Sequence, residues 1–427
     1  MRSTLVRALA TVTVASLLLT GCSMGTGDAG SDPNNPNQVE AITWWASGVE
    51  KTALYDMVDV FTEQNPDMQF IDASVRGTGG DKARQAIAAR LDSKNPPDTF
   101  QAAAGAALSD YVAAGQVQDL TSFYAKNDLT DVYRAALIEL MSVDGKVYSV
   151  PSDIHRVNVL WTDNKLLKAA GVDPKTAPAN IDAWIADLEK VRASGVEYPL
   201  ALGNDLTQLQ LFETVLISDM GAVLYQNLWK STKNWEGARL QTAIAHYGEL
   251  LDFVNPQARS REWNEVTQAV VEHDAAYIVM ADYALSSFQR AGYILDKQYG
   301  AMPVPGTVGI FDFTADSFVL PTGAVHEAGA EKWLLTVSSA EGQKALSFTK
   351  GSIPARTDTN AADYGPYQKG AIASLQLDTV VPSIAHGIAA KPSWLKAITA
   401  AVTKFGSDRH PEALSKALIA AANTALG

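Results

Sequence analysis

The chain has 427 residues, a formal net charge of −13 at pH 7 and 47% hydrophobic residues. A chain of this length rarely folds around a single hydrophobic core, so we expect more than one α/β domain. The acidic balance and the lack of a long Lys/Arg cluster argue against nucleic acid as a partner. A single cysteine excludes an intrachain disulfide and a Cys-based metal site. The six histidines show no paired ligand spacing, so we expect neither a metal nor a cofactor.

The first 21 residues have the pattern of a signal peptide. Two arginines precede an apolar stretch at residues 8–20, which is too short for a permanent membrane helix. This stretch runs into Leu19-Thr20-Gly21-Cys22, which resembles the bacterial lipobox. The resemblance implies that Cys22 is lipidated and begins the mature chain, which is then anchored outside the bacterial cell membrane. An ordinary signal peptide with a chance cysteine is the alternative. Residues 22–38, rich in Gly, Pro, Asn and Asp, are predicted to be the lipidated Cys and a flexible tether.

Strand and helix patterns alternate from residue 39 onward. Apolar residues at i, i+3, i+4 and i+7 predict a helix over residues 54–61, which Asn65-Pro66 ends. Around that helix we predict strands at residues 39–44, 68–75 and 98–101 and a helix at residues 83–91. This order predicts a mostly parallel sheet with helices on both faces.

A second alternation begins after Pro151. The predicted strands are at residues 157–161, 198–202, 276–280 and 317–321. The predicted helices include residues 165–170, 181–191, 331–337, 341–348 and 411–426. The two alternations predict two α/β lobes, with a ligand site in the cleft between them.

Large aromatic residues stand at the ends of predicted elements. Trp44 and Trp45 end the first strand, Trp263 begins a helix and Tyr283 follows a strand. Such rings are typical platforms for the apolar C–H face of a sugar. Neighbours on a strand point to opposite faces, so one of the two adjacent tryptophans can belong to the core. Core packing is the alternative for each of the four.

Charged side chains could meet the hydroxyl groups of such a ligand. The candidates are Glu50, Asp153, His155, Asp316, Lys350 and His386. A carboxylate accepts from two adjacent hydroxyls, while Lys350 and a ring N–H of His386 donate to hydroxyl oxygens. The alternatives are surface charges and, for His386, a core histidine.

Short stretches in a fixed order resemble the extracellular solute-binding proteins of ABC sugar importers, most closely the glucose/mannose-binding branch of family 1. They are residues 42–46 (ITWWA), 98–101 (DTFQ), 149–151 (SVP), 154–156 (IHR), 200–203 (LALG), 207–208 (TQ), 316–318 (DSF) and 350–353 (KGSI), with Ser383 and His386-Gly387. The resemblance covers essentially the whole mature chain. It implies the α/β, two-lobed periplasmic-binding-protein fold (type II-like) with a hinge crossed more than once.

The resemblance also implies where the lobes divide. We expect residues 39–153 plus 282–316 in the N-terminal lobe and residues 154–281 plus 317–427 in the C-terminal lobe. Hinge crossings are expected near residues 153–157, 280–283 and 316–320.

The ligand contacts implied by the resemblance are Trp45, Glu50, Gln101, Trp263, Tyr283, Asp316, Lys350 and His386. Two departures from the family pattern lie at the sugar edge: Ala103 replaces a histidine, and the loop between Trp45 and Glu50 is one residue longer. They leave the identity of the sugar open.

We therefore expect a monomeric, non-enzymatic receptor that captures a monosaccharide such as glucose or a related hexose. Its partners are the sugar, the permease subunits of an ABC importer and, through Cys22, the membrane. An oligosaccharide-binding protein of the same fold remains an alternative. A lipid-anchored glycoside hydrolase, with two carboxylates about 5 to 9.5 Å apart, is a further one.

Overall fold

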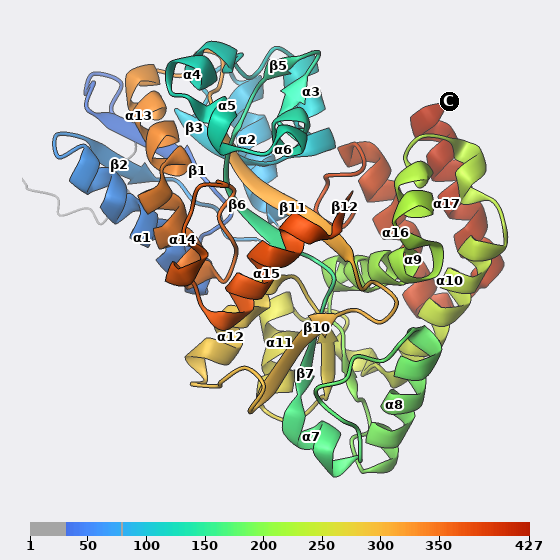
Figure 1. Ribbon diagram of the computed structural model, residues 1–427. Helices are drawn as coiled ribbons and strands as arrows, with labels where there is room; N and C mark the ends of the chain where they lie inside the picture. Colours follow the sequence, from blue (N-terminus) through green and yellow to red (C-terminus); the bar gives the residue numbers. More distant parts are fainter. Residues whose placement is uncertain (1–30, 78–79) are drawn as a thin grey trace, which may run out of the picture. The chain divides into compact units, whose positions relative to one another are not determined.

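The computed structural model describes residues 31–77 and 80–427 (Figure 1). The predicted signal peptide and Cys22 lie outside the described residues. Within them, no helix combines the length and the apolar character needed to cross a membrane. The predicted tether through residue 38 is too long, because its last part is bonded to the folded chain. The amide of Gln38 donates to the carbonyl oxygen of Asp32 at 2.6 Å, and His326 Nε2 lies 3.2 Å from the same oxygen.

The larger sheet has the strand order β12-β11-β3-β1-β2, and β6 also pairs with β11. The bounds are Gln38–Ile42 (β1), Gln69–Asp72 (β2), Thr99–Ala103 (β3), Val150–Arg156 (β6), Ile310–Val319 (β11) and Thr379–Pro382 (β12). β1 is parallel to β2 and β3, whereas β11 is antiparallel to both β3 and β6. β12 is parallel to β11. The sheet is therefore mixed: the parallel pairing predicted for the first strands is confirmed, whereas β11 and β12 run in the reverse direction.

Helices cover both faces of this sheet, as predicted. Phe318 and Trp45 face a core that includes α1 (Gly48–Gln64), α13 (Glu327–Ser338) and α14 (Ala340–Lys350). The next residue on β11, Val319, points to the other face and packs with α2 (Asp81–Asp92) and α3 (Leu108–Ala113). The predicted apolar stripe of α1 is buried, and the helix ends at Asn65 as expected.

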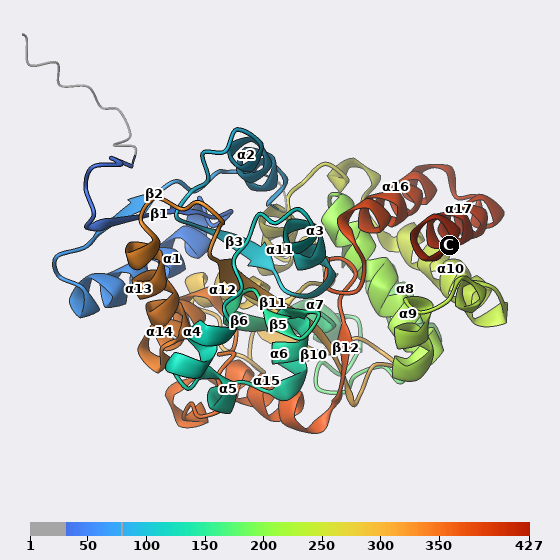
Figure 2. The same ribbon diagram turned by 90° about the horizontal axis from the view of Figure 1, so that it is seen from above.

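The smaller sheet has the order β10-β7-β9-β8. Its strands are β7 (Val159–Asp163), β8 (Leu200–Ala201), β9 (Tyr277–Val279) and β10 (Tyr299–Pro303). The helices on this side of the chain are α7 (Asn164–Ala169), α8 (Ile181–Ala193), α9 (Asp205–Leu228), α10 (Ala238–Leu250), α11 (Trp263–Val271), α16 (Pro392–Asp408) and α17 (Pro411–Leu426). Both views show α16 and α17 beside α9 and α10, away from α1, α13 and α14 (Figure 2).

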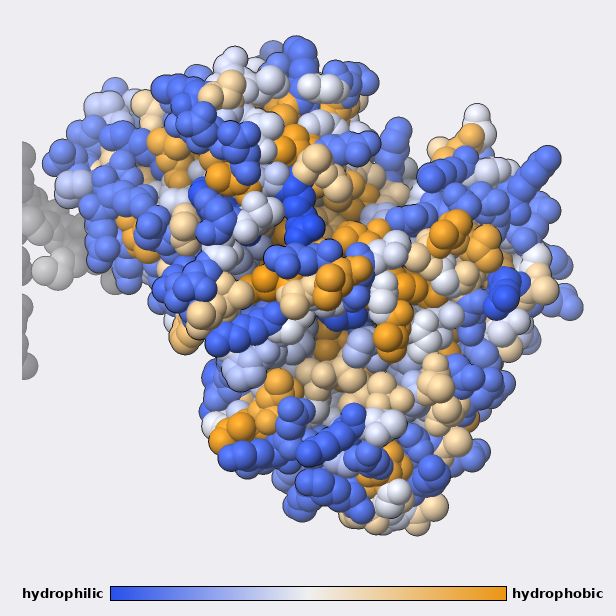
Figure 3. Space-filling view, viewed as in Figure 1, coloured by the Kyte–Doolittle hydropathy of each residue, from blue (hydrophilic) through white to orange (hydrophobic). Residues whose placement is uncertain are grey.

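Shorter elements complete the fold. They are the hairpin of β4 (Ser142–Val143) and β5 (Lys146–Val147), the helices α4 (Thr121–Lys126), α5 (Leu129–Val132), α6 (Ala135–Leu140), α12 (Leu285–Arg290) and α15 (Pro366–Leu377), and the 3₁₀ turn η6 (Asp282–Ala284). On the face in Figure 3, apolar residues gather over α15 and β12, where Leu377 is exposed.

The two sheets divide the chain differently from the expected lobe boundaries. We expect residues 282–316 in the N-terminal lobe, but β10, which lies in this range, belongs to the smaller sheet. We expect residues 317–427 in the C-terminal lobe, but α13 and α14 pack in the core of the larger sheet. The physical reason is β11, a continuous strand of ten residues in the larger sheet. The segment IFDFTA in its first part alternates apolar and polar residues, a strand signal that a prediction starting at residue 317 does not use.

The chain passes between the sheets at positions that only partly match the expectation. It leaves β6 and enters β7 at residues 157–158, which agrees with a crossing near residues 153–157. It returns between β10 and β11, at residues 304–309, and not near residues 316–320, which lie at the end of β11. After residues 280–283 it forms η6 and α12 and then re-enters the smaller sheet as β10. A further passage leads from β12 to α16.

Candidate functional site

The candidate site is built where β11 lies between β3 and β6. In the register of the larger sheet, Asp316 of β11 lies opposite Asp153 of β6 and opposite Ala103 of β3. The β6 register shifts beyond this point, so that Ser317 faces Pro151 and Ser152 forms a bulge. Bulges of this kind re-aim side chains next to functional sites. Here the bulge is followed directly by the fully buried Asp153.

Lys350 reaches the same point from the last turn of α14. A cation is favoured there because the C-terminal end of a helix carries partial negative charge. The helix ends at Gly351, whose φ of 91° is in the left-handed region. A Cβ atom at Gly351 would also lie 3.0 Å from the carbonyl oxygen of Asp282. Glycine therefore permits both the cap and the close approach of α14 to η6.

Two aspartates share the ammonium group of Lys350. Lys350 Nζ donates to Asp153 Oδ2 at 2.9 Å and to Asp316 Oδ2 at 2.5 Å. The side chain of Lys350 is 1% exposed and that of Asp153 is fully buried, whereas the Asp316 side chain is 15% exposed. Asp316 is therefore the carboxylate of this pair that still reaches the surface of the site.

His155 extends this ion cluster toward the smaller sheet. Its Nε2 lies 3.1 Å from Asp153 Oδ2 and 3.6 Å from Asp316 Oδ2, and its Nδ1 contacts Asp282 Oδ1. Asp282 also accepts from the backbone N–H of Arg156 at 3.0 Å. Asp282 was not predicted from the sequence. The available signal was its place at the end of an apolar strand, directly before the predicted Tyr283.

The opposite charges of these groups stabilise one another's ionised forms. Burial disfavours the ionised form of Asp153, but the charges of Lys350 and His155 outweigh it and hold its pKa below the usual value. Burial likewise acts to raise the pKa of Asp316, but the charge of Lys350 lowers it below the usual value. Burial lowers the pKa of Lys350, but Asp153 and Asp316 raise it above its usual value. Burial and Lys350 disfavour the imidazolium of His155, yet Asp282 and Asp153 hold its pKa well above the ordinary range. The site is thus a compact network of paired ions.

The remaining candidates of the larger-sheet half surround this network. The ring of Trp45 is fully buried and lies 4.2 Å from Lys350 Nζ, a cation–π contact. Gln101 donates to Asp316 Oδ1 at 3.0 Å and accepts from the backbone N–H of Trp44 at 3.1 Å. Trp44 itself is half-buried, and its ring lies 6.0 Å from the guanidinium of Arg84, whereas the contact with Lys350 is made by Trp45.

Glu50 lies in the first turn of α1, where a carboxylate is favoured by the helix dipole. Burial raises its pKa from 4.5 to about 7, while Lys350 acts in the opposite direction. The charges of Asp316 and His155 also influence this pKa.

Aromatic groups close the site on the side of the smaller sheet. Tyr283 lies edge-to-face with His155, with ring centroids 5.5 Å apart, and 6.3 Å from the ring of His386. Trp263, the first residue of α11, contacts Tyr283 at 4.6 Å. The two aromatic rings therefore form one wall.

Every candidate ligand residue except the side chain of Trp44 is thus connected to one cluster. Asp153, His155 and Asp316 each offer an atom that could bind a metal ion, and these atoms lie within 4.8 Å of one another. Lys350 already places a positive charge beside Asp153, where a metal ion would lie. Cavities of about 240 and 380 Å³ lie elsewhere, the first beside Arg156 and Tyr367, the second beside Lys165 and His273. The arrangement offers ionised hydrogen-bonding groups beside aromatic faces.

Comparisons with known proteins identify the family of the chain. The family model for bacterial extracellular solute-binding proteins matches residues 45–344. The chain is 30% identical to a probable sugar-binding periplasmic protein of Mesorhizobium japonicum, over 91% of this chain and 94% of the relative. It is 27% identical to a xylose/arabinose-binding protein of Haloferax volcanii, over 90% of this chain and 84% of the relative.

Solved structures show the same fold. A bacterial solute receptor with a preference for β-D-galactopyranose superposes with a TM-score of 0.78 at 18% identity, covering 92% of this chain and 99% of the other. A chitin oligosaccharide binding protein gives a TM-score of 0.79 at 16% identity, covering 91% and 98%. The matching family model describes extracellular solute-binding proteins, which supports a binding protein over the glycoside hydrolase alternative. The chain belongs to the family of bacterial extracellular solute-binding proteins and has their two-lobed fold.

Proposed function

We propose that the protein captures a sugar, a monosaccharide such as glucose or a related hexose, at the ion cluster and delivers it to the permease of an ABC importer. The observation that carries the proposal is the pairing of Asp316 with Lys350 beside aromatic rings. A carboxylate held ionised by a lysine accepts from two hydroxyl groups, and charge-assisted hydrogen bonds are the stronger kind.

Both halves of the chain contribute groups to this site. Asp316, Lys350 and Gln101 belong to the larger-sheet half, whereas Tyr283 and Trp263 belong to the smaller-sheet half. A ligand that contacts both halves binds the closed state more tightly than an open one, so its binding favours closure. Closure is the signal that such a receptor offers to a permease.

The arrangement of the aromatic rings favours a single sugar ring over a long chain. Trp263 and Tyr283 contact each other and form one short wall, whereas a row of separated aromatic platforms would favour an oligosaccharide. Ala103 lies opposite Asp316 and leaves a small side chain at the position of the family's histidine. This substitution changes the hydrogen bonds available at the sugar edge. An oligosaccharide ligand remains the second candidate, because a chitin oligosaccharide binding protein has this fold.

The cellular context is part of the same proposal. Lipidation of Cys22 would anchor a monomeric receptor outside the bacterial membrane, with residues 23–30 as the connection to the folded chain. Related proteins described as periplasmic sugar-binding proteins support an extracytoplasmic location.

A thermal-shift screen over hexoses, pentoses and disaccharides tests the proposal. A ligand present at 100 times its Kd adds about 2.7 kcal/mol to the free energy of unfolding. We expect a hexose to raise the unfolding midpoint of the wild type and to have a much smaller effect on Asp316→Asn. Stabilisation by oligosaccharides alone would favour the second candidate, and no stabilisation by any sugar would contradict the proposal.

A further inference from the structure

A buried glutamate of α9 is connected to the candidate ligand residue His386. Glu213 is fully buried, and the backbone N–H groups of Ile384 and Ala385 donate to its Oε1 and Oε2 at 2.5 and 3.2 Å. Ser383 Oγ lies 3.0 Å from Glu213 Oε2 and also 3.0 Å from His386 Nδ1. The serine therefore stands between the carboxyl group and the imidazole.

The direction of these hydrogen bonds follows from the number of protons. A serine hydroxyl has one proton to donate. An ionised Glu213 has no proton to donate, so Ser383 donates its proton to Oε2, which also accepts from the N–H of Ala385. The Ser383 oxygen in turn accepts from the backbone N–H of His386 at 3.3 Å and from its ring Nδ1. Nδ1 must therefore carry a proton.

Protonation of Glu213 at Oε1, the oxygen beside Tyr225, does not change this result. Burial raises the pKa of Glu213 to about 7. The phenol oxygen of Tyr225 lies 2.8 Å from Glu213 Oε1 and 3.0 Å from the carbonyl oxygen of Pro382. Tyr225 can donate to Pro382 and accept a proton from Oε1. Oε2 then stays an acceptor for Ser383 in both states of the carboxyl group.

The second ring nitrogen of His386 is left as a free acceptor. Its Nε2 is buried and has no hydrogen-bond partner among the described residues. Burial and the charge of His155 lower the pKa of His386 to about 4, so the ring is neutral at pH 7. The ring lies beside Tyr283, one of the proposed sugar contacts.

We propose that Glu213 and Ser383 are positioning residues that fix His386 as the Nδ1–H tautomer, so that Nε2 accepts a hydrogen bond from a ligand hydroxyl. The inference rests on the proposed function for the identity of the ligand, but the tautomer does not depend on it. It reverses the role expected from the sequence, in which a ring N–H of His386 donates to the ligand. At this position the receptor selects a ligand hydroxyl that donates a hydrogen bond. A deoxyfluoro analogue can only accept hydrogen bonds there, so its affinity should be lower by about tenfold or more.

Nitrogen NMR of the full-length, ligand-free protein with ¹⁵N-labelled histidine tests the tautomer. The signals of His386 are assigned by their loss in His386→Gln. We expect a protonated, pyrrole-type Nδ1 and an unprotonated, pyridine-type Nε2 at pH 7. Ser383→Ala removes the acceptor of Nδ1–H and should give a mixture of tautomers, while Ser383→Thr keeps the hydroxyl and the wild-type pattern.

The control is Ser338→Ala, which removes another buried serine hydroxyl that donates to a backbone carbonyl in α13. It should leave the His386 signals unchanged. A wild-type His386 protonated at Nε2 would overturn the inference, even if Ser383→Ala does not fold. Because no sugar is present, this result is separate from the outcome of the sugar screen.

Discussion

Replacement of Lys350 by methionine tests whether the ion cluster is a paired network or a group of independent charges. The ammonium group of Lys350 is the partner of both Asp153 and Asp316, and the side chains of Lys350 and Asp153 are buried. Lys350→Met retains most of the apolar volume but leaves both carboxylates without this cation. Removal of one partner from a buried ion pair costs about 3–5 kcal/mol, because the other charge stays buried and unpaired.

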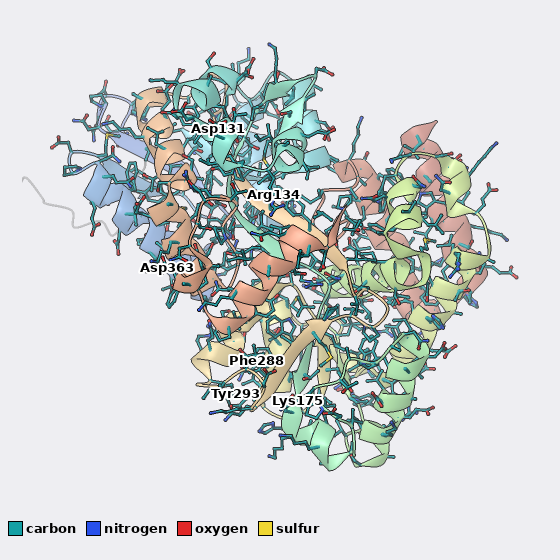
Figure 4. The ribbon with its side chains drawn as sticks, viewed as in Figure 1. Asp131, Arg134, Lys175, Phe288, Tyr293 and Asp363 are labelled. Atoms are coloured by element: carbon teal, nitrogen blue, oxygen red, sulfur yellow. The ribbon has the colours of Figure 1, made fainter. Side chains whose placement is uncertain are left out.

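The same helix provides a matched control. Lys344 of α14 pairs with Asp363, labelled in Figure 4, at the same distance of 2.9 Å as Lys350 and Asp153. The Lys344 and Asp363 side chains are 51% and 40% exposed. An exposed pair contributes about 0–1 kcal/mol, so Lys344→Met should destabilise the protein far less.

Urea unfolding at pH 7 without sugar measures both variants. We expect the free energy of unfolding to fall by about 3–5 kcal/mol in Lys350→Met and by less than about 1 kcal/mol in Lys344→Met. The double variant Lys350→Met/Asp316→Asn should recover part of the loss, since it removes one unpaired charge. Equal, small effects of the two lysine substitutions would refute the paired network.

Three further predictions concern other parts of the chain. The pKa of Glu50 is about 7 in the folded state and 4.5 ordinarily, so the unfolded state releases its proton first as the pH rises. As the pH rises from about 4.5 to 7, the free energy of unfolding of the wild type, measured in urea, should therefore fall relative to that of Glu50→Gln. Parallel pH profiles of the two proteins would contradict the raised pKa. Trp263→Ala should weaken sugar binding with little change in the unfolding midpoint of the free protein, whereas a loss near 3–5 kcal/mol would identify it as a core residue. Cys22→Ser should release the protein from membranes on fractionation, and retention at wild-type levels would exclude the lipid anchor.

The parts of the fold that the sequence predicts are those with a regular apolar period. The stripe of α1 identifies the helix and its end at Asn65, because one buried face repeats every three to four residues. β6 is different: the segment VPSDIHR is buried along its full length although most of its side chains are polar or charged. No apolar period marks such a strand. Its polar side chains are accommodated by partners from distant segments, which a local pattern does not contain.

The structure brings most candidate residues together, while their role in ligand binding stays a prediction. Asp153, His155, Asp316 and Lys350 come together as one cluster, and the signal was their charge together with the family resemblance of the stretches around them. Asp282 was missed because its role depends on contact with His155, a residue more than one hundred positions away. The side-by-side arrangement of Trp263 and Tyr283 was equally hidden, since it depends on how α11 meets η6.

The most direct test of the proposed function is calorimetric titration of the wild type and Asp316→Ala with the hexose that stabilises the wild type most. We predict one site per chain for the wild type. In Asp316→Ala the affinity should be at least tenfold weaker, mainly through faster dissociation, because Lys350 and Gln101 lose their shared carboxylate partner. An affinity of Asp316→Ala within twofold of the wild type would remove Asp316 from the site and contradict the account.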